Sequence, residues 1–534
     1  MGAITAAGNP RSARQESEGS AQHRQADAPV VIIGAGMGGL AAAITLAARG
    51  VEVLVLERAA VPGGKVRVLE SGGRPVDAGP TVFTMPWVFE SLFADAGADF
   101  HRSLQPEPME RIAHHGWQDG SELDLFSDLE ASAEAISSFS SAPADAQRFL
   151  RFMAQAERTF STLKSSFLEA SKPNPVSLSW RAGVAATLAI RPFQRLMTTL
   201  EGQFEDPRLR QLFGRYATYC GASPYQAPAT LMLVAHVEQM GVYRLPGGMV
   251  SLAGALADLA VASGAQIECG VDVVDVRRRA GKGFEVITGD ERVLVAERVI
   301  ANADAGAIAD GVLGDTCASV VAPVSVADRS LSAITWVMSA EARGRPIDHH
   351  NVYFSRDYAA EFHALQRERR MPSDPTVYVC AQDRPFPAEA SGPTDERLLC
   401  LINAPPTGDL HSLDQRELNR CEENMFRTLE NCGVALTPTA SSRITTPTGF
   451  QALFPGTGGN LYGRASHGWQ ATFRRPANRT RLPGFYLAGG SVHPGPGVPM
   501  AAMSGRLAAQ ALLADSTSRF QYRPTATAGG ISMP

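Results

Sequence analysis

The sequence predicts an α/β protein in which a domain built on a parallel, doubly wound sheet is interrupted by an inserted α+β domain. Three observations lead to this prediction. The apolar runs at residues 29–33 and 51–56 flank a Gly-rich turn and an Ala/Leu-rich segment, which is the pattern of a βαβ unit. Near the other end of the chain, an apolar run at 485–488 precedes a Gly/Pro-rich loop and a helical pattern at 498–513. Between them, residues 122–215 carry helical patterns, so we expect the parallel sheet to be discontinuous.

Size and composition restrict the class of protein. The chain has 534 residues, too many for one compact core, so two or three domains are expected. A net charge of −5 argues against a nucleic-acid partner, which usually requires a basic face. The seven cysteines form no CxxC pair, which favours reduced thiols in the cytoplasm over a zinc site or a disulfide framework. The chain has no run of about 18 apolar residues, so no transmembrane helix is predicted.

The Gly-rich turn after the first strand has the spacing of a dinucleotide-binding motif. In G-x-G-x-x-G, Gly34 permits the tight turn, Gly36 lets the backbone approach a pyrophosphate, and Gly39 lets helix and strand pack closely. The helix N-terminus then offers free N–H groups to the phosphates. Glu57 ends the second strand, where an acid can accept hydrogen bonds from a ribose. The segment therefore predicts a Rossmann-type dinucleotide site.

Two further features favour FAD over NAD. Residues 62–65 (Pro-Gly-Gly-Lys) and 77–80 (Asp-Ala-Gly-Pro) match the extended motif of glutathione-reductase-like flavoproteins, which include amine oxidases and carotene desaturases. The strand, loop and helix at 484–513 resemble the segment that closes around the flavin ribityl chain and ring in those families. By this resemblance, the further cofactor-binding residues are Gly64, Lys65 (usually Arg in those families), Val273 (an adenine contact), Gly489, Gly490, Val498, Pro499 and Met500.

The resemblance implies a split architecture of the amine-oxidase and phytoene-desaturase type. Its predicted parts are a disordered leader at 1–28, an FAD-binding domain at 29–100, 243–315 and 476–515, a substrate and membrane-facing domain at 101–242 and 316–475, and a disordered tail at 516–534. Many relatives carry an acid in the C-terminal loop where this chain has Ser491, so the ribityl contact is expected from backbone or from Ser491. No second G-x-G-x-x-G follows a strand, so a diffusible electron acceptor such as quinone or oxygen is expected.

The most specific resemblance lies at residues 488–500, Ala-Gly-Gly-Ser-Val-His-Pro-Gly-Pro-Gly-Val-Pro-Met. Together with residues 30–83, 214–258 and 482–514, this segment resembles the bacterial phytoene desaturase family over nearly the whole of 29–515. The Gly-Gly-Ser-Val-His-Pro form followed by Val-Pro-Met resembles one branch of that family, the hydroxyneurosporene (methoxyneurosporene) desaturases, which are 1-hydroxycarotenoid 3,4-desaturases.

The resemblance implies an FAD-dependent oxidoreductase that forms a C3–C4 double bond in 1-hydroxy acyclic carotenoids. Protein side chains cannot accept a hydride, so oxidation of a C–C bond to C=C requires the flavin. The candidate catalytic residues are His493, Tyr219 and Arg215, with Glu238 as a further candidate proton acceptor. The sequence leaves alternatives open, because His493 also fits a hydrogen-bonded loop residue and Tyr219 also fits a packed aromatic residue.

A carotenoid substrate lies in a bilayer, so we expect a cytoplasmic protein that binds the membrane surface peripherally. Residues 180–197, most of them in a helical segment predicted at 182–204, combine apolar side chains with Arg181, Arg191 and Arg195. This segment fits an interfacial helix, and a helix packed on the protein core fits it equally well.

Other functional classes stay open at this point. A phytoene or neurosporene desaturase, or another carotenoid end-group oxidoreductase, would use the same scaffold. Prenyl-binding escort proteins share the fold without needing flavin, although the intact glycine motif and Glu57 argue against that class. Amine oxidases commonly hold flavin on a Cys near the C-terminal loop, and this chain has none after Cys432. No metal site is expected, because the adjacent His349 and His350 should point apart on a strand.

Overall fold

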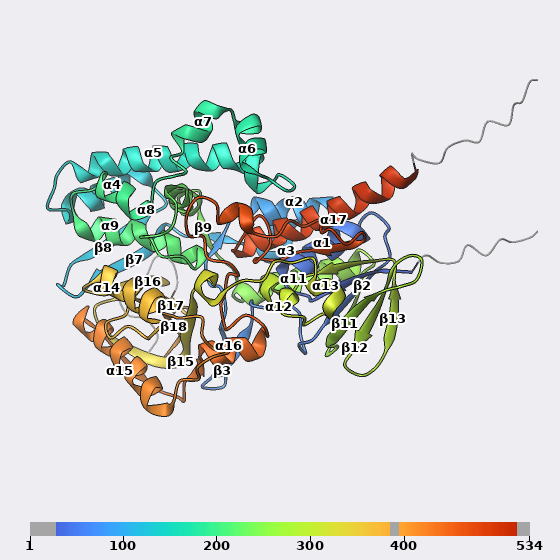
Figure 1. Cartoon of the computed structure of the whole chain (residues 1–534). Helices are drawn as coiled ribbons and strands as arrows, with labels where there is room; N and C mark the ends of the chain where they lie inside the picture. The colour runs from blue at the N-terminus through green and yellow to red at the C-terminus, as the bar shows by residue number, and fades with distance from the viewer. Residues whose placement is uncertain (1–27, 385–394, 521–534) are drawn as a thin grey trace, which may run out of the picture.

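The computed structural model describes residues 28–384 and 395–520 (Figure 1). Its first layer is a five-stranded parallel sheet in the order β10-β2-β1-β14-β21. The strands are β1 (Val30–Ile33), β2 (Val53–Glu57), β10 (Gln266–Cys269), β14 (Arg298–Ala301) and β21 (Phe485–Leu487). They come from three separated parts of the chain, so the sheet is discontinuous, as the sequence predicts.

Helices cover one face of this sheet, and a small antiparallel sheet covers the other. α11 and α17 pack against α1 on the first face (Figure 1). Alternate side chains of β1 serve the two faces, because Val30 and Ile32 belong to the helical core while Val31 and Ile33 belong to the core beneath the small sheet. The covering elements are α1 (Met37–Ala47), α11 (Met249–Ala262), α17 (Val498–Phe520), β11 (Val273–Arg278), β12 (Phe284–Thr288), β13 (Val293–Ala296) and α12 (Ala305–Ala309).

A second, largely antiparallel sheet carries the inserted domain. Its order is β19-β15-β18-β17-β16-β7-β8, with β20 paired to β15. One face packs on α15, and helices from residues 129–239 cover the other, with separate apolar cores on the two sides. The strands are β7 (Arg111–Trp117), β8 (Glu122–Phe126), β15 (Ser332–Gly344), β16 (His350–Phe354), β17 (Val377–Ala381), β18 (Glu396–Ala404), β19 (Val434–Pro438) and β20 (Arg443–Thr445).

The helices of this domain gather mainly above the second sheet in Figure 1. They are α4 (Leu129–Phe139), α5 (Asp145–Leu163), α6 (Pro175–Ala182), α7 (Val184–Ala189), α8 (Leu196–Glu201), α9 (Pro207–Gly214), the 3₁₀ helix η2 (Arg215–Cys220), α10 (Leu233–Gln239), α14 (Tyr358–His363) and α15 (Gln415–Asn431). Shorter elements complete the fold: α2 (Trp87–Asp95), α3 (Phe100–Leu104), β3 (Val68–Ser71), β4 (Arg74–Asp77), β5 (Phe83–Thr84), β6 (Glu107–Pro108), β9 (Val242–Arg244), α13 (Asp315–Ala318) and α16 (Pro447–Leu453).

The helical segment predicted at 182–204 is broken, so the prediction of one continuous helix there is wrong. Gly183 has a φ of +85° and separates α6 from α7. Arg191 has a φ of +50° and precedes Pro192, which disfavours helical geometry in the residue before it. The segment therefore forms two short helices and a loop before α8.

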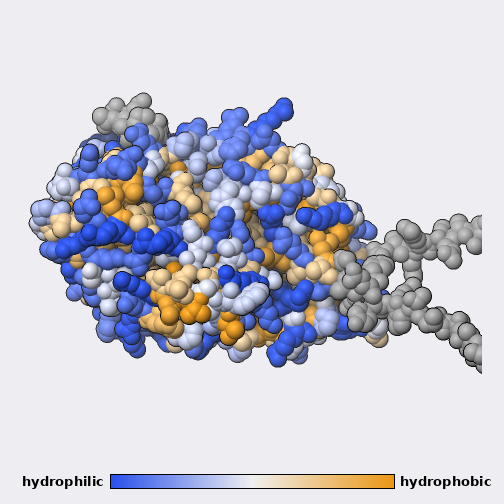
Figure 2. Space-filling view, turned by 90° about the horizontal axis from the view of Figure 1, so that it is seen from above, coloured by the Kyte–Doolittle hydropathy of each residue, from blue (hydrophilic) through white to orange (hydrophobic). Residues whose placement is uncertain are grey.

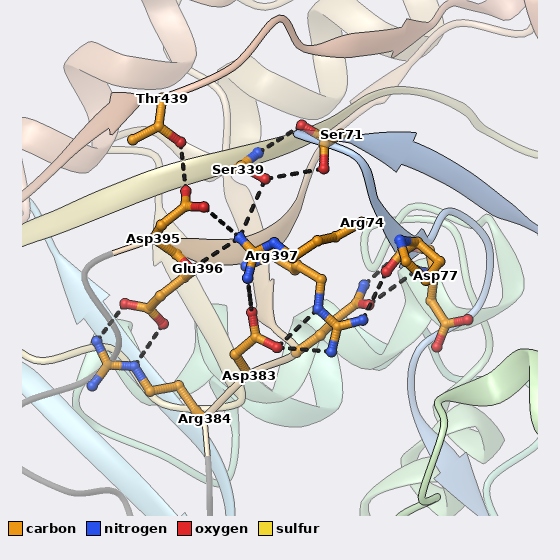
Figure 3. A network of polar contacts seen from close by, with 12 residues as sticks. Ser71, Arg74, Asp77, Ser339, Asp383, Arg384, Asp395, Glu396, Arg397 and Thr439 are labelled. Atoms are coloured by element: carbon orange, nitrogen blue, oxygen red, sulfur yellow. Dashed lines mark hydrogen bonds and ion pairs between the residues drawn. The ribbon is translucent and has the colours of Figure 1, made fainter.

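A polar network ties the β3–β4 hairpin to the second sheet (Figure 3). The Arg74 guanidinium lies 2.7 Å from the Asp395 carboxylate and 3.4 Å from Asp383. Arg397 contacts the same Asp383 at 2.7 Å. Arg384 and Glu396 form a buried ion pair of 2.6 Å beside them. These contacts hold the hairpin against the ends of β17 and β18.

The helix α17 extends into the segment predicted to be a disordered tail. α17 continues to Phe520, so the prediction of a disordered tail is wrong for residues 516–520. The remainder of the predicted tail, and residues 1–27 of the predicted leader, lie outside the described residues. Within 28–384 and 395–520, no helix is both long and apolar enough to cross a bilayer. All seven cysteines are free thiols.

Candidate functional site

The glycine turn between β1 and α1 leaves no room for side chains. Gly34 has a φ of +95°, and a Cβ on Gly39 would lie 2.0 Å from the Gly34 carbonyl oxygen. A Cβ on Gly36 would lie 3.0 Å from the Asn302 Nδ2 atom. No side chain caps the N-terminus of α1. The first N–H groups of α1 are therefore open to an anion, which is the arrangement that a pyrophosphate needs.

Glu57 lies at the carboxyl end of β2, directly beside this turn. Its carboxylate accepts hydrogen bonds from the backbone N–H groups of Ala35 (2.6 Å) and Ala59 (2.8 Å). A carboxylate has about four acceptor positions, so two remain for another donor. The geometry fits the predicted ribose contact and adds a second role, because Glu57 also holds the glycine turn to the end of β2.

The Pro-Gly-Gly-Lys segment packs on the glycine turn. Gly64 has a φ of +62°, and a Cβ there would lie 3.2 Å from the Gly36 Cα. The Lys65 ammonium donates to the Leu461 carbonyl at 2.6 Å and lies 5.3 Å from the centre of the Phe454 ring. Burial lowers the pKa of Lys65. Lys65 therefore connects the flavin motif to the loop at 454–461.

The C-terminal loop meets the glycine turn through Asn302, which the sequence analysis did not identify. The Asn302 amide donates to the Gly34 carbonyl at 3.2 Å, and a Cβ on Gly489 would lie 2.8 Å from its Oδ1 atom. Asn302 directly follows β14, so a polar residue at the end of an apolar strand is the signal that could have found it. α17 begins at Val498 with Pro499 in its first turn and Met500 next, as predicted.

Arg475 is a second residue that sequence reasoning missed. Its guanidinium is buried and donates to the carbonyl oxygens of Gly490 (3.2 Å), Tyr462 (2.9 Å) and Arg464 (2.6 Å). Burial lowers its pKa to about 10, still far above neutrality, so Arg475 is a cation beside the C-terminal loop. Ser491 accepts a hydrogen bond from the Ala305 N–H at 2.9 Å, so its hydroxyl oxygen already serves α12.

Val273 is buried at the start of β11, and the N–H of Val271 just before it donates to the Glu57 carbonyl oxygen at 2.9 Å. This places Val273 next to the strand that carries Glu57. The adenine contact stays a prediction. Taken together, the glycine cradle, the uncapped helix and the acid at the end of β2 fit FAD.

His493 is buried in the C-terminal loop at 488–497. Its Nε2–H donates to the Ala170 carbonyl at 2.8 Å, and the Phe167 ring lies edge-to-face with the imidazole at 5.0 Å. Burial lowers the pKa of His493 to about 4. The imidazole is therefore neutral at physiological pH and a weak proton acceptor.

Tyr219, Arg215 and Glu238 form one buried group. The Tyr219 hydroxyl donates to the Glu238 carboxylate and accepts a long bond of 3.4 Å from Arg215. The Arg215 guanidinium lies 5.2 Å from the Tyr219 ring centre and 5.6 Å from that of Tyr216. Burial alone would lower the pKa of Arg215, but Tyr219 and Glu238 raise it above its usual value. The group therefore contains a fixed positive charge.

The prediction that His349 and His350 point apart is wrong. Their ring centres are 4.6 Å apart, because His349 precedes β16 and does not follow the alternation of a strand. The Cys380 sulfur lies 3.8 Å from the His349 Nε2 atom. Burial raises the pKa of the Cys380 thiol to about 12, and the ligand atoms of His349, His350 and Cys380 lie within 4.8 Å of one another. The expectation that no metal binds here stays a prediction.

A cavity of about 590 Å³ is lined by the loops at 192–195 and 223–228, by α14 and the turn that follows it, and by the loop at 467–469. Aromatic side chains of Phe193, Tyr225, Phe362 and Trp469 contribute to its walls. Phe193 and Trp469 pack edge-to-face at 5.3 Å, and both are exposed. The cavity therefore opens beside exposed apolar side chains at the surface of the second domain.

Comparison with known proteins shows to which family this chain belongs. The model of the flavin-containing amine oxidoreductases matches residues 37–513, which spans both domains. The chain belongs to this family. Its membership agrees with the glycine cradle and with the flavin predicted to bind there.

Two relatives of this chain are named as carotenoid enzymes. A hydroxyneurosporene desaturase of Rubrivivax gelatinosus is 48% identical over 513 residues, covering 94% of this chain and 96% of that protein. A 1-hydroxycarotenoid 3,4-desaturase of Flavobacterium sp. is 30% identical, covering 90% of this chain and 98% of that protein. The carotenoid desaturase family predicted from residues 488–500 is thus confirmed.

Solved structures confirm the architecture of this amine oxidoreductase fold. A putrescine oxidase with bound putrescine superposes with a TM-score of 0.58 at 15% identity, covering 92% of this chain and 99% of that one. An oxidoreductase from Methanosarcina mazei gives a TM-score of 0.56 at 17% identity, covering 91% and 100%. At these identities the likeness concerns the fold alone.

Proposed function

We propose that this protein is an FAD-dependent desaturase that introduces the C3–C4 double bond into 1-hydroxy acyclic carotenoids. The observation that carries the proposal is the 48% identity, over nearly the full length of both chains, to a protein named hydroxyneurosporene desaturase. Two more proteins of that name, from Cereibacter sphaeroides and Rhodobacter capsulatus, are 42% and 41% identical over comparable lengths.

When bound, FAD supplies the two-electron acceptor for the hydride that leaves the substrate carbon. Gly34, Gly36 and Gly39 would let the backbone approach its pyrophosphate, and Glu57 would accept hydrogen bonds from its ribose. The N-terminus of α17, at Val498, would present its positive dipole end to the ring. These assignments are proposals that rest on the fit of the turn and loop.

Desaturation also releases a proton, and the Tyr219–Glu238 pair suits that task better than His493. The hydroxyl of Tyr219 already hydrogen-bonds the buried Glu238 carboxylate, so a proton that arrives at the hydroxyl can pass to the acid. The nearby Arg215 charge would oppose accumulation of positive charge on the polyene and so favour prompt proton loss. His493, with its pKa of about 4, would accept the proton poorly.

Access to a carotenoid in a bilayer would come through an exposed apolar patch on α6, α7 and the following loop. Its members are Val176 (79% exposed), Trp180 (83%), Val184 (64%), Leu188 (58%) and Phe193 (65%). Figure 2 views the molecule from the side of α6 and α7, where hydrophobic areas lie among hydrophilic ones. Because Phe193 also lines the 590 Å³ cavity, the patch adjoins that cavity. Peripheral binding to the cytoplasmic membrane surface would also bring the reduced enzyme to a membrane quinone, with oxygen as the other acceptor.

Activity is tested by giving the purified, FAD-loaded protein a 1-hydroxy acyclic carotenoid and its unhydroxylated parent. The proposal expects a red shift of the polyene absorption and a product two hydrogens lighter, faster with the hydroxylated substrate. Equal turnover of both compounds would refute the 1-hydroxy assignment and favour a phytoene- or neurosporene-type desaturase.

Membrane binding is tested separately by flotation with anionic vesicles. The double substitution Trp180→Asp and Leu188→Asp should abolish co-flotation, because each inserts a charge into the apolar patch. Leu410→Asp is the matched control, since Leu410 is 64% exposed and lies outside the patch. Unchanged flotation of the double variant would contradict this membrane face.

A further inference from the structure

Arg215 is buried, and the negative charge of Glu238 reaches it only across Tyr219. It is 8% exposed, yet within residues 28–384 and 395–520 it forms no ion pair, and its hydrogen bonding consists of the 3.4 Å contact with Tyr219. Its Nε atom is buried and has no hydrogen-bond partner there. Buried guanidinium groups normally have most of their donors satisfied, so this one is available to a further acceptor.

Two histidines of the second sheet present complementary atoms on the face toward Arg215. β7 pairs in parallel with β16 so that His115 lies opposite Val352, and β17 places Tyr378 opposite the same Val352. His350 precedes Val352 by two residues, so His115, His350 and Tyr378 share one face of the sheet. Tyr216 and Tyr219, beside Arg215, belong to the apolar core on that face.

The two imidazoles each have a free ring nitrogen. The Nδ1–H of His115 donates to the Leu123 carbonyl at 3.1 Å, which leaves Nε2 as an unprotonated acceptor, and this atom is buried and unpartnered among the described residues. His350 contacts the Tyr378 hydroxyl at 2.8 Å through Nδ1, and its Nε2 is likewise buried and unpartnered. Burial lowers the pKa of both imidazoles and the Arg215 charge lowers it further, so both rings are neutral.

A series of aromatic side chains connects the cavity to this cluster. Tyr225 lies against Phe362 with ring centres 6.2 Å apart, and Phe362 lies 5.0 Å from Tyr358. Tyr358 lies 6.2 Å from Phe354, which stacks on His115 at 6.2 Å. Phe354, Tyr358 and Phe362 are buried and packed on one another, so a polyene that enters from the cavity would displace these rings to reach the polar atoms of the cluster.

We propose that Arg215 and His115 bind the tertiary hydroxyl of the substrate end group, with Arg215 donating to its oxygen and His115 Nε2 accepting its proton. This assignment rests on the proposed function and names the residues that select the hydroxylated end. A hydroxyl has one donor and two acceptor positions, so it can satisfy both residues together. A carboxylate cannot, because it has no hydrogen to give to His115. Tyr219, which is hydrogen-bonded to both Arg215 and Glu238, then lies beside the bound end group, where it is also the proton acceptor proposed above.

The test compares kcat/KM for a 1-hydroxy carotenoid and for the same carotenoid without the hydroxyl, using Arg215→Met, Arg215→Lys and His115→Phe in FAD-loaded protein. We expect the preference for the hydroxylated compound to fall about 10- to 100-fold in Arg215→Met and in His115→Phe, since each loses one bond in a buried site. Arg215→Lys should retain part of the preference because it keeps a donor. His114→Phe is the matched control: the neighbouring His114 points to the opposite face, where it pairs with Asp124 at 2.7 Å, so its replacement should leave the preference unchanged.

An equal fall for both substrates would overturn the proposal: Arg215 would keep only the electrostatic role in proton loss proposed above, and His115 would have a role in catalysis or folding. A changed flavin spectrum or FAD affinity in Arg215→Met would assign Arg215 to the cofactor instead. If the wild-type protein desaturates neither compound, the proposed function fails, and the hydroxyl site is then tested by binding alone. In that case the polyene spectral shift on binding should still favour the hydroxylated compound in wild type and not in His115→Phe, and equal binding in both proteins would refute the site.

Discussion

Glu361 in α14 should make the stability of the cavity wall depend on pH. Its carboxyl is buried, and Oε2 accepts hydrogen bonds from Ser355 (2.7 Å) and Thr376 (2.7 Å) while Oε1 has no partner among the described residues. Burial raises the pKa of Glu361 from 4.5 to about 7. The folded protein therefore holds this proton more tightly than the unfolded chain does.

The sign and size of the effect follow from that difference. Below pH 4.5 both states are protonated and the contribution to stability is complete. As the pH rises from 4.5 to about 7, the unfolded chain ionises first, so stability is lost. At about 1.4 kcal/mol for each pH unit, the loss amounts to about 3 kcal/mol above pH 7.

The substitution Glu361→Gln removes the titration and keeps a similar shape. Relative to wild type, this variant should gain about 3 kcal/mol in the free energy of unfolding between pH 4.5 and pH 8, measured as thermal midpoints by circular dichroism. Glu368→Gln is the control, because Glu368 is an exposed acid that follows the same helix. If wild type and Glu361→Gln show the same pH dependence, the reasoning from burial is refuted.

Three further predictions concern the cofactor site and its support. Gly39→Ala should abolish FAD binding in a titration followed by flavin fluorescence, because its Cβ would lie 2.0 Å from the Gly34 carbonyl oxygen; a variant that retains FAD would show that the turn can widen. Glu57→Ala should weaken FAD binding by about 1.5–3 kcal/mol, since a charge-assisted acceptor is lost, and an unchanged Kd would show that Glu57 does not bind the ribose. Breaking the buried Arg384–Glu396 pair by Glu396→Leu should cost about 3–5 kcal/mol of stability in thermal denaturation, with much of it restored by adding Arg384→Met; a single variant as stable as wild type would contradict this.

Sequence reasoning succeeded where the signal is local. Gly34, Gly36 and Gly39 follow a strand and open a helix, so their spacing alone specifies the turn, and the last strand and helix follow from the same kind of pattern. It missed Asn302 and Arg475 because their roles depend on carbonyl groups and glycines that are distant in the chain. The failure at residues 349–350 has a similar cause, because the two imidazoles approach each other only where β16 begins. The face shared by His115 and His350 depends on a strand pairing across more than 200 residues, which no local periodicity reports.

The split architecture also determines when the flavin domain can finish folding during synthesis. α1 is buried along its whole length, and part of its cover is α17, which comes from the C-terminal part of the described residues. During synthesis the N-terminal βαβ unit therefore leaves the ribosome long before α17 is made. Until then, the apolar surface of α1 that α17 covers is exposed. A chain that terminated just before Val498 would contain every glycine of the cofactor turn and still lack the helix that packs on α1. Completion of the flavin domain is thus tied to the synthesis of α17, so chains that stop before it should bind FAD poorly.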